Sequence, residues 1–102
     1  MSNITSIGVS GLDAATKRLG AAASNIANAS TPGYTPVQAV SQATADGGVQ
    51  TDIRASADDA GGVDLASEAV NVDQSVIGYK ANAAVIRAAD DMQRELLRDF
   101  HV

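Results

Sequence analysis

The chain has 102 residues, a formal net charge of −5, three aromatic residues and no cysteine. This length fits a single domain, residues 1–102, at most. Much of the 45% hydrophobic content is alanine, which buries little area per residue, so a self-sufficient core is not expected. The acidic balance argues against nucleic acid as a partner, because its phosphates would repel the chain. Without cysteine there is no disulfide framework and no thiol chemistry.

Neither a membrane span nor a cleaved leader is predicted. No run approaches the roughly 18–20 apolar residues that a helix needs to cross a bilayer, so direct membrane insertion is not expected. The opening "MSNITSIGVSGLDAATKRLG" has no basic start followed by an apolar stretch. A protein of this kind that leaves the cytoplasm must use a route that needs no such signal.

The first predicted element is a helix over about residues 4–29. Its apolar positions alternate in steps of three and four, the spacing of a coiled-coil seam. Gly8 and Gly11 interrupt the pattern, so the first ten residues are expected to be loosely helical or to order only against partners. The seam consists of Leu12, Ala15, Leu19, Ala22 and Ile26.

This helix must end by Ser30, within the stretch "AASNIANASTPGYTP". Pro32 disfavours helical backbone at the preceding residue and lacks an N–H. Residues 31–34 suit a type II turn, with proline at the first corner and Gly33 at the second. Asn25 and Asn28 lie where asparagine can bond the last free carbonyls of the helix.

The middle, about residues 30–62, is predicted to be irregular or to form a small hairpin. Val37–Ser41 and Val49–Ala55 are weak strand candidates, joined by a turn through residues 46–48. A two-stranded ribbon is marginal by itself in water. The stretch "SADDAGG", Ser56–Gly62, is interpreted as an acidic, flexible link.

The second predicted helix spans about residues 64–100. Asp64 is a good N-cap, and Glu68 places negative charge near the positive end of the helix dipole. Gly78, in its middle, indicates that a neighbour approaches closely, or merely a local weakness. The apolar seam runs through Leu65, Ala69, Val72, Val76, Tyr79, Ala83 and Ile86, then shifts to Ala89, Met92, Leu96 and Phe100.

The two seams predict a mainly all-α fold, an antiparallel coiled-coil-like pair of helices joined by the short middle. Tyr79 is interpreted as a packed residue of the seam. Val70, Ile77 and Val85 lie outside the seam, so one partner helix cannot cover the second helix completely. An apolar stripe that remains exposed usually marks an interface.

Two segments resemble the bacterial flagellar axial family, which comprises the rod, hook and hook-associated proteins. "SGLDAATKRLGAAASNIANASTPGY", residues 10–34, resembles its N-terminal signature, and residues 63–97 resemble its C-terminal helix. The first match includes Asn25, Ile26, Asn28 and Tyr34, and the second includes Leu65, Tyr79, Asn82, Ile86, Met92 and Leu96. The C-terminal half is most similar to short proximal-rod proteins, although the middle is shorter than in most of them.

The resemblance implies a structural subunit of the basal-body rod, which spans the periplasm. Its partners would be copies of itself, other axial proteins and the type III export apparatus, which exports such subunits without signal cleavage. The implied interface residues are Leu12, Leu19, Asn25, Ile26, Asn28, Tyr34, Leu65, Val72, Val76, Tyr79, Asn82, Ile86, Met92 and Leu96.

No catalytic, cofactor-binding or metal site is predicted, and the protein is not expected to be an enzyme. The single histidine, His101, is next to the C-terminus and has no fixed partners for acid–base work. Two other functions remain open. One is a cytosolic helical adaptor that binds a single flagellar or export partner, which the short middle would suit. The other, an interfacial membrane helix, is weakened by the lack of a basic face on the second helix.

Overall fold

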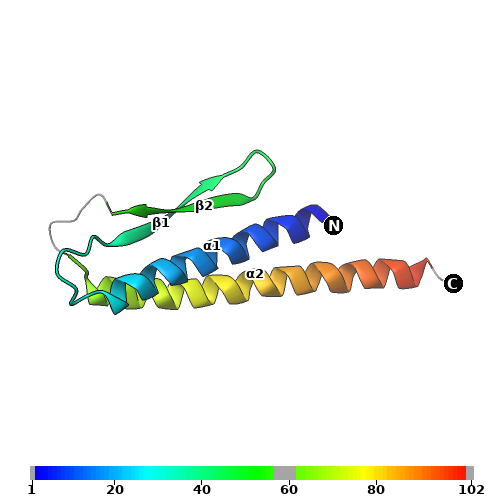
Figure 1. Ribbon diagram of the computed structural model, residues 1–102. Coiled ribbons are helices and arrows are strands. Elements are labelled where there is room, and N and C mark those ends of the chain that lie inside the picture. Colours follow the sequence, from blue (N-terminus) through cyan, green and yellow to red (C-terminus); the bar gives the residue numbers. More distant parts are fainter. Residues whose placement is uncertain (1, 57–61, 101–102) are drawn as a thin grey trace.

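A computed structural model describes residues 2–56 and 62–100 of the chain. The elements follow one another as α1 (Ser2–Ala27), β1 (Val37–Ala43), β2 (Val49–Ala55) and α2 (Leu65–Asp99). The molecule is long and thin, with extents of 66 × 25 × 14 Å (Figure 1). Most of the predicted acidic link, residues 57–61, and His101 lie outside the described residues.

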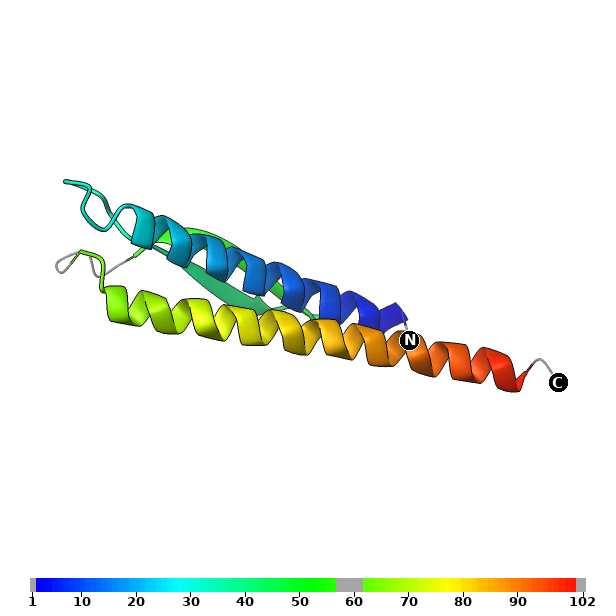
Figure 2. The same cartoon turned by 90° about the horizontal axis from the view of Figure 1, so that it is seen from below.

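The two helices lie side by side and antiparallel, and α2 extends well past the N-terminal end of α1 (Figures 1 and 2). The predicted mainly-α fold, a helix pair with a small hairpin between its members, is confirmed. Residue numbers facing each other across the pair add up to about the same value throughout. Facing pairs are Gly8 with Ile86, Gly11 with Asn82, and Ala15 with Gly78.

Helix α1 is regular from Ser2 onward, so the expectation that the first ten residues are only loosely helical is wrong. The two glycines that motivated it lie against α2. A Cβ on Gly11 would come within 2.2 Å of Oδ1 of Asn82, and one on Gly8 within 2.6 Å of Cγ1 of Ile86. Helix-weakening glycines are used here for close approach between the helices, and that contact holds the first turns in place.

The end of α1 follows the prediction. The N–H of Tyr34 donates to the carbonyl of Thr31 at 3.3 Å, and Gly33 has a φ of +76°, as the second corner of a type II turn requires. Nδ2 of Asn28 donates to the carbonyl of Ser24 at 3.0 Å, so this asparagine does bond a carbonyl near the helix end.

The predicted hairpin is present, with β2 at its expected bounds and β1 two residues longer than expected. The N–H of Thr44 donates to the carbonyl of Gly48 at 2.9 Å and closes a three-residue loop, residues 45–47. Gly47 in this loop has a φ of +92°, which is typical of a hairpin with a bulged turn.

The ribbon packs along α1. Nζ of Lys17 donates to the carbonyl of Thr51 at 2.9 Å, and the N–H of Val49 donates to Oγ of Ser10 at 3.1 Å. These bonds stabilise a ribbon that would be marginal alone.

Helix α2 begins with the predicted cap. Oδ1 of Asp64 accepts from the N–H groups of Ala66 and Ser67 at 3.1 and 3.3 Å. These bonds, chiefly those from the backbone and hydroxyl of Ser67, lower the pKa of Asp64 below its ordinary 3.8. Along its exposed last turns the helix carries the ion pairs Arg94–Asp90 at 3.2 Å and Arg98–Glu95 at 3.4 Å.

The residues buried between the elements are small or polar. They are Ala15, Ala21, Ala22 and Ala89 together with Asn25, Thr51, Glu68 and Ser75. Helix α2 therefore turns toward α1 a line of positions seven residues apart: Glu68, Ser75, Asn82 and Ala89. From Leu65 to Ala83 the predicted seam of α2 lies beside this line, so that part of the seam is not the contact between the two helices. Farther along, Ile86 and Ala89 of the seam do lie against α1.

Tyr79 shows the consequence. Its side chain is 48% exposed, and the interpretation as a packed residue of the chain is wrong. Short side chains allow the helix axes to come close, and a tyrosine in the same position would hold them apart. In contrast, Gly78 does meet the predicted close neighbour, since a Cβ there would contact that of Ala15 at 4.0 Å.

Candidate assembly surface

On α1, three sides of the helix have different neighbours. Ser10 and Lys17 bond to the hairpin, and Ala15 and Ala22 are buried against α2. Leu12, Leu19 and Ile26, also seven residues apart, follow on the other side of the alanine line, because successive helical positions are about 100° apart. This side of α1 faces neither the hairpin nor the centre of α2.

Helix α2 likewise has one flank toward the hairpin and one flank away from it. Gln74, whose Oε1 accepts from Nη2 of Arg18 at 3.2 Å, lies on the flank that lines a groove beneath the hairpin. The opposite flank carries most of the predicted seam. In an antiparallel pair the two flanks away from the hairpin adjoin, so this flank continues the leucine side of α1.

The adjoining flanks form one surface, which we call the apolar face. In Figure 2 the helix pair is seen with the hairpin behind it, so the view is onto this side. The face contains no charged residue. Most of its large side chains are more than a third exposed, for example Leu19 at 39% and Val76 at 38%. It consists of Leu12, Thr16, Leu19, Ala23, Ile26, Leu65, Ala69, Val72, Val76, Tyr79 and Ala83.

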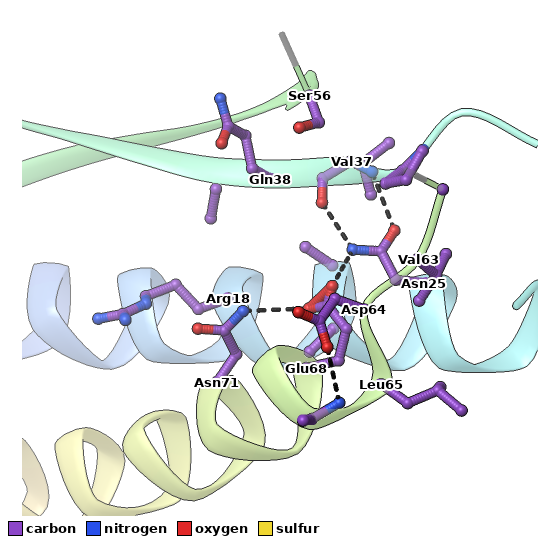
Figure 3. A pocket seen from close by; sticks show the side chains of 16 residues that line it. Arg18, Asn25, Val37, Gln38, Ser56, Val63, Asp64, Leu65, Glu68 and Asn71 are labelled. Atoms are coloured by element: carbon purple, nitrogen blue, oxygen red, sulfur yellow. Dashed lines mark hydrogen bonds between the residues drawn. The ribbon is translucent and has the colours of Figure 1, made fainter. Parts of the chain in front are cut away.

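At one end of the helix pair, Asn25 lies at the centre of a polar cluster (Figure 3). Its Oδ1 accepts from the hydroxyl of Tyr34 and from the N–H of Val37, both at 2.9 Å. Its Nδ2 donates to the carbonyl of Val37 at 2.8 Å and to Oε2 of Glu68 at 2.7 Å. The amide thus uses both donors and both acceptor sites, and it joins α1, β1 and α2.

Asn25 is therefore a correction to the predicted interface. Its side chain is 2% exposed and fully bonded within the chain, so it has nothing left for a neighbouring subunit. Tyr34 and Asn28 also bond within the chain, to Ser24 among others, although both stay partly accessible. The two asparagines and the tyrosine thus stabilise the turn at residues 31–34 through hydrogen bonds to the end of α1.

Two further predicted residues also serve the helix contact. Nδ2 of Asn82 donates to the carbonyl of Gly78 at 2.8 Å, and the amide rests on Gly11. Ile86 rests on Gly8 in the same way. Met92 and Leu96, in contrast, lie beyond the N-terminal end of α1 and are 55% and 48% exposed.

The described residues offer little to catalysis. A groove of about 950 Å³ lies between the base of the hairpin, α1 and the start of α2. The carboxylate of Glu68 in it accepts from the amides of Asn25 and Asn71, so each of its oxygens already has a hydrogen bond within the chain. Within residues 2–56 and 62–100, no three acidic or histidine side chains come together as metal ligands, and no helix is long and apolar enough to cross a membrane.

Residues 6–35 match the family model described as flagella basal body rod protein. The matched segment runs along α1 to the turn that carries Tyr34, and of the Asn25 cluster it contains Asn25 and Tyr34 but not Val37 or Glu68. The resemblance to the flagellar axial family is confirmed. A search of curated proteins found no match to the chain. The flagellar match ends before the hairpin, so the similarity of residues 63–97 to the C-terminal helix of the family stays a prediction.

For the flagellar segment, the structure gives a physical reason for its residue pattern. The alanines pack against α2, Asn25 fixes the first residue of β1, and Gly33 forms the turn that brings Tyr34 back onto the helix. Leu12, Leu19 and Ile26, in contrast, make no comparable contact within the described part of the chain. These residues were identified from the sequence, whereas the buried role of Glu68 was missed, because a first-turn glutamate is typical of any solvated helix start.

Proposed function

We propose that the protein is a non-enzymatic structural subunit of the flagellar basal-body rod, assembled with copies of itself and other axial proteins. The observation that carries the proposal is the apolar face. Over Leu12–Ile26 of α1 and Leu65–Ala83 of α2 it carries no charge, whereas the molecule as a whole is acidic. The family match supports a structural role of the rod type.

The distribution of apolar side chains favours assembly over a stable monomer. The interior of the chain consists mainly of alanine and small polar groups, so most of its large apolar side chains remain in contact with water. Burying a fully exposed Leu, Ile or Val contributes about 1.5–3 kcal/mol, and these side chains are already partly covered within the chain, so covering the remainder contributes about 1 kcal/mol each. Several such side chains lie on the face, and we propose that their burial by neighbouring subunits drives assembly.

Export by the flagellar type III apparatus, without a cleaved leader, is part of the same proposal, as is a place in the periplasm-spanning rod. The proximal part of the rod fits best, because the middle segment is only a two-stranded ribbon. These statements depend on the family resemblance more than on the geometry.

The test is a comparison of two variants in cells that build flagella. Leu19→Glu combined with Val76→Glu places charge in the centre of the apolar face, and Ala84→Glu adds charge on the exposed back of α2. Both should keep native helix content, because Leu19 and Val76 are already 39% and 38% exposed and Ala84 is exposed as well. We expect the wild type and the Ala84 variant in purified hook–basal bodies, and the face variant to be absent from them.

Recovery of the wild-type chain exclusively from the cytosol would contradict the rod proposal. That result would favour the cytosolic adaptor that binds a single flagellar or export partner, for which the face would serve as a docking site for one protein.

A further inference from the structure

The last turns of α2 form an overhang, defined here as Met92–Asp99, which continues after α1 has ended. Across the pair, facing residue numbers add up to about 93, so Ser2, the first residue of α1, lies near residue 91. In Figures 1 and 2 the orange and red turns of α2 project beyond the N-terminus. The overhang thus has no intramolecular partner helix among the described residues.

The side of α2 that contacts α1 continues along the overhang. Heptad positions Glu68, Ser75, Asn82 and Ala89 are followed on the same line by Leu96, with Phe100 and Leu97 next to it on one side. Leu96, Leu97 and Phe100 are 48%, 57% and 85% exposed. In the covered part, this side carries small residues; past the end of α1 it becomes apolar. The exposed surface is therefore continuous with an existing helix interface.

A partner that continues this interface must be a helix that runs antiparallel to α2 and meets α1 end to end. A second copy supplies one, namely its own overhang. In that arrangement each overhang covers the apolar side of the other overhang, as α1 covers the same side along the rest of α2. The C-terminal tip of one copy would come to the N-terminus of α1 in the other copy.

The charges at this junction are favourable. The first turn of α1 has no acidic residue of its own, so no side chain of that turn offsets the positive end of its dipole. The partner's helix C-terminus brings the negative end of its dipole, while the charges of Arg98 and Asp99 in its last turn offset each other. Opposite helix ends attract each other, most strongly at low ionic strength.

We infer that two copies of the free chain pair through their overhangs, antiparallel and about a twofold axis that passes between Leu96 and Leu97. This contact is separate from the apolar face and does not depend on the rod role. An overhang is only about 12 Å long, so the interface is far smaller than that of a stable dimer, and the pairing is weak and reversible.

The first experiment measures molecular mass by sedimentation equilibrium at rising concentration, at low salt. All samples carry Leu19→Glu and Val76→Glu, so that the apolar face cannot contribute. We expect reversible dimerisation that Leu96→Glu with Leu97→Glu abolishes and that Ala84→Glu leaves unchanged. A chain that stays monomeric to millimolar concentration would overturn the inference, as would a dimer that the overhang variant leaves intact.

The second experiment measures the geometry of the pair. The chain has no cysteine, so Ala81→Cys, in the same face-substituted background, gives a single site for a nitroxide label. Antiparallel pairing about residues 96 and 97 places the two labels about 45 Å apart along the helices, whereas parallel pairing places them within about 15 Å. A dominant distance near 45 Å in pulsed electron spin resonance supports the arrangement, and a dominant short distance overturns it.

Discussion

Nδ2 of Asn25 donates a hydrogen bond of 2.7 Å to Oε2 of Glu68, and this contact joins the end of α1 to the first turn of α2. The same amide bonds both backbone groups of Val37. One side chain therefore sets where the second helix and the hairpin start relative to the first helix.

Replacing Asn25 by alanine should destabilise the fold strongly. The change leaves Oε2 of Glu68 without its donor, although Oε1 keeps the bond from Asn71, and it leaves both backbone groups of Val37 without these partners in a partly buried place. Each buried polar group that loses its partner costs about 1–3 kcal/mol. We expect a total loss of about 2–4 kcal/mol in the free energy of unfolding, measured by urea unfolding followed by circular dichroism. Asn28→Ala is the control, because that amide is partly accessible to water and should cost less than about 1 kcal/mol. Equal losses in the two variants would contradict the role of Asn25.

Adding a methyl group at Gly11 should destabilise the helix pair, although alanine is the better helix former. The new Cβ would overlap the amide of Asn82, which would have to give up its bond to Gly78. Gly20 has no atom within 4 Å of its Cβ position, so Gly20→Ala should stabilise the chain by about 0.5–1 kcal/mol. We expect the two substitutions to shift the unfolding midpoint in opposite directions.

The overlap has its own check. Combining Gly11→Ala with Asn82→Ala should restore part of the loss, because the second change removes the atoms that collide. Strictly additive losses from the two changes would argue against a direct contact between these positions.

The N-cap predicts a pH dependence for α2. Hydrogen bonds lower the pKa of Asp64, so its ionised form is favoured in the folded chain. For a lowered carboxyl pKa, the stabilisation is fully present above the unfolded value of about 4 and is lost as the pH falls through the folded value. We expect wild-type stability to fall below about pH 4 relative to that of Asp64→Asn, whose amide caps the helix without titrating. Parallel acid profiles of the two proteins would show that the cap contributes nothing.

Much of this fold follows from local rules in the sequence. Pro32 and Gly33 end α1, Asp64 starts α2, and Gly47 turns the hairpin, each through backbone requirements that act within a few residues. The boundaries of these elements were accordingly predicted to within two residues or so, and β2 matched fully.

Which side of each helix faces the other was not predictable in the same way. Periodicity finds the apolar stripe that needs covering, but it does not say whether the cover comes from the same chain. Here the close contact uses Gly8, Gly11 and Ser75, residues that carry little hydrophobic signal. The partly exposed Leu19 and Val76 carry that signal, and they lie on the apolar face.

The central claim is that neighbouring subunits of the rod cover the apolar face. A photo-crosslinking amino acid at Val76, introduced in cells that build flagella, tests it most directly. The account predicts that, after illumination, purified basal bodies contain this chain joined covalently to axial proteins or to its own copies. If the labelled chain is absent from the basal bodies, or is present there without any crosslink from this position, the claim is contradicted.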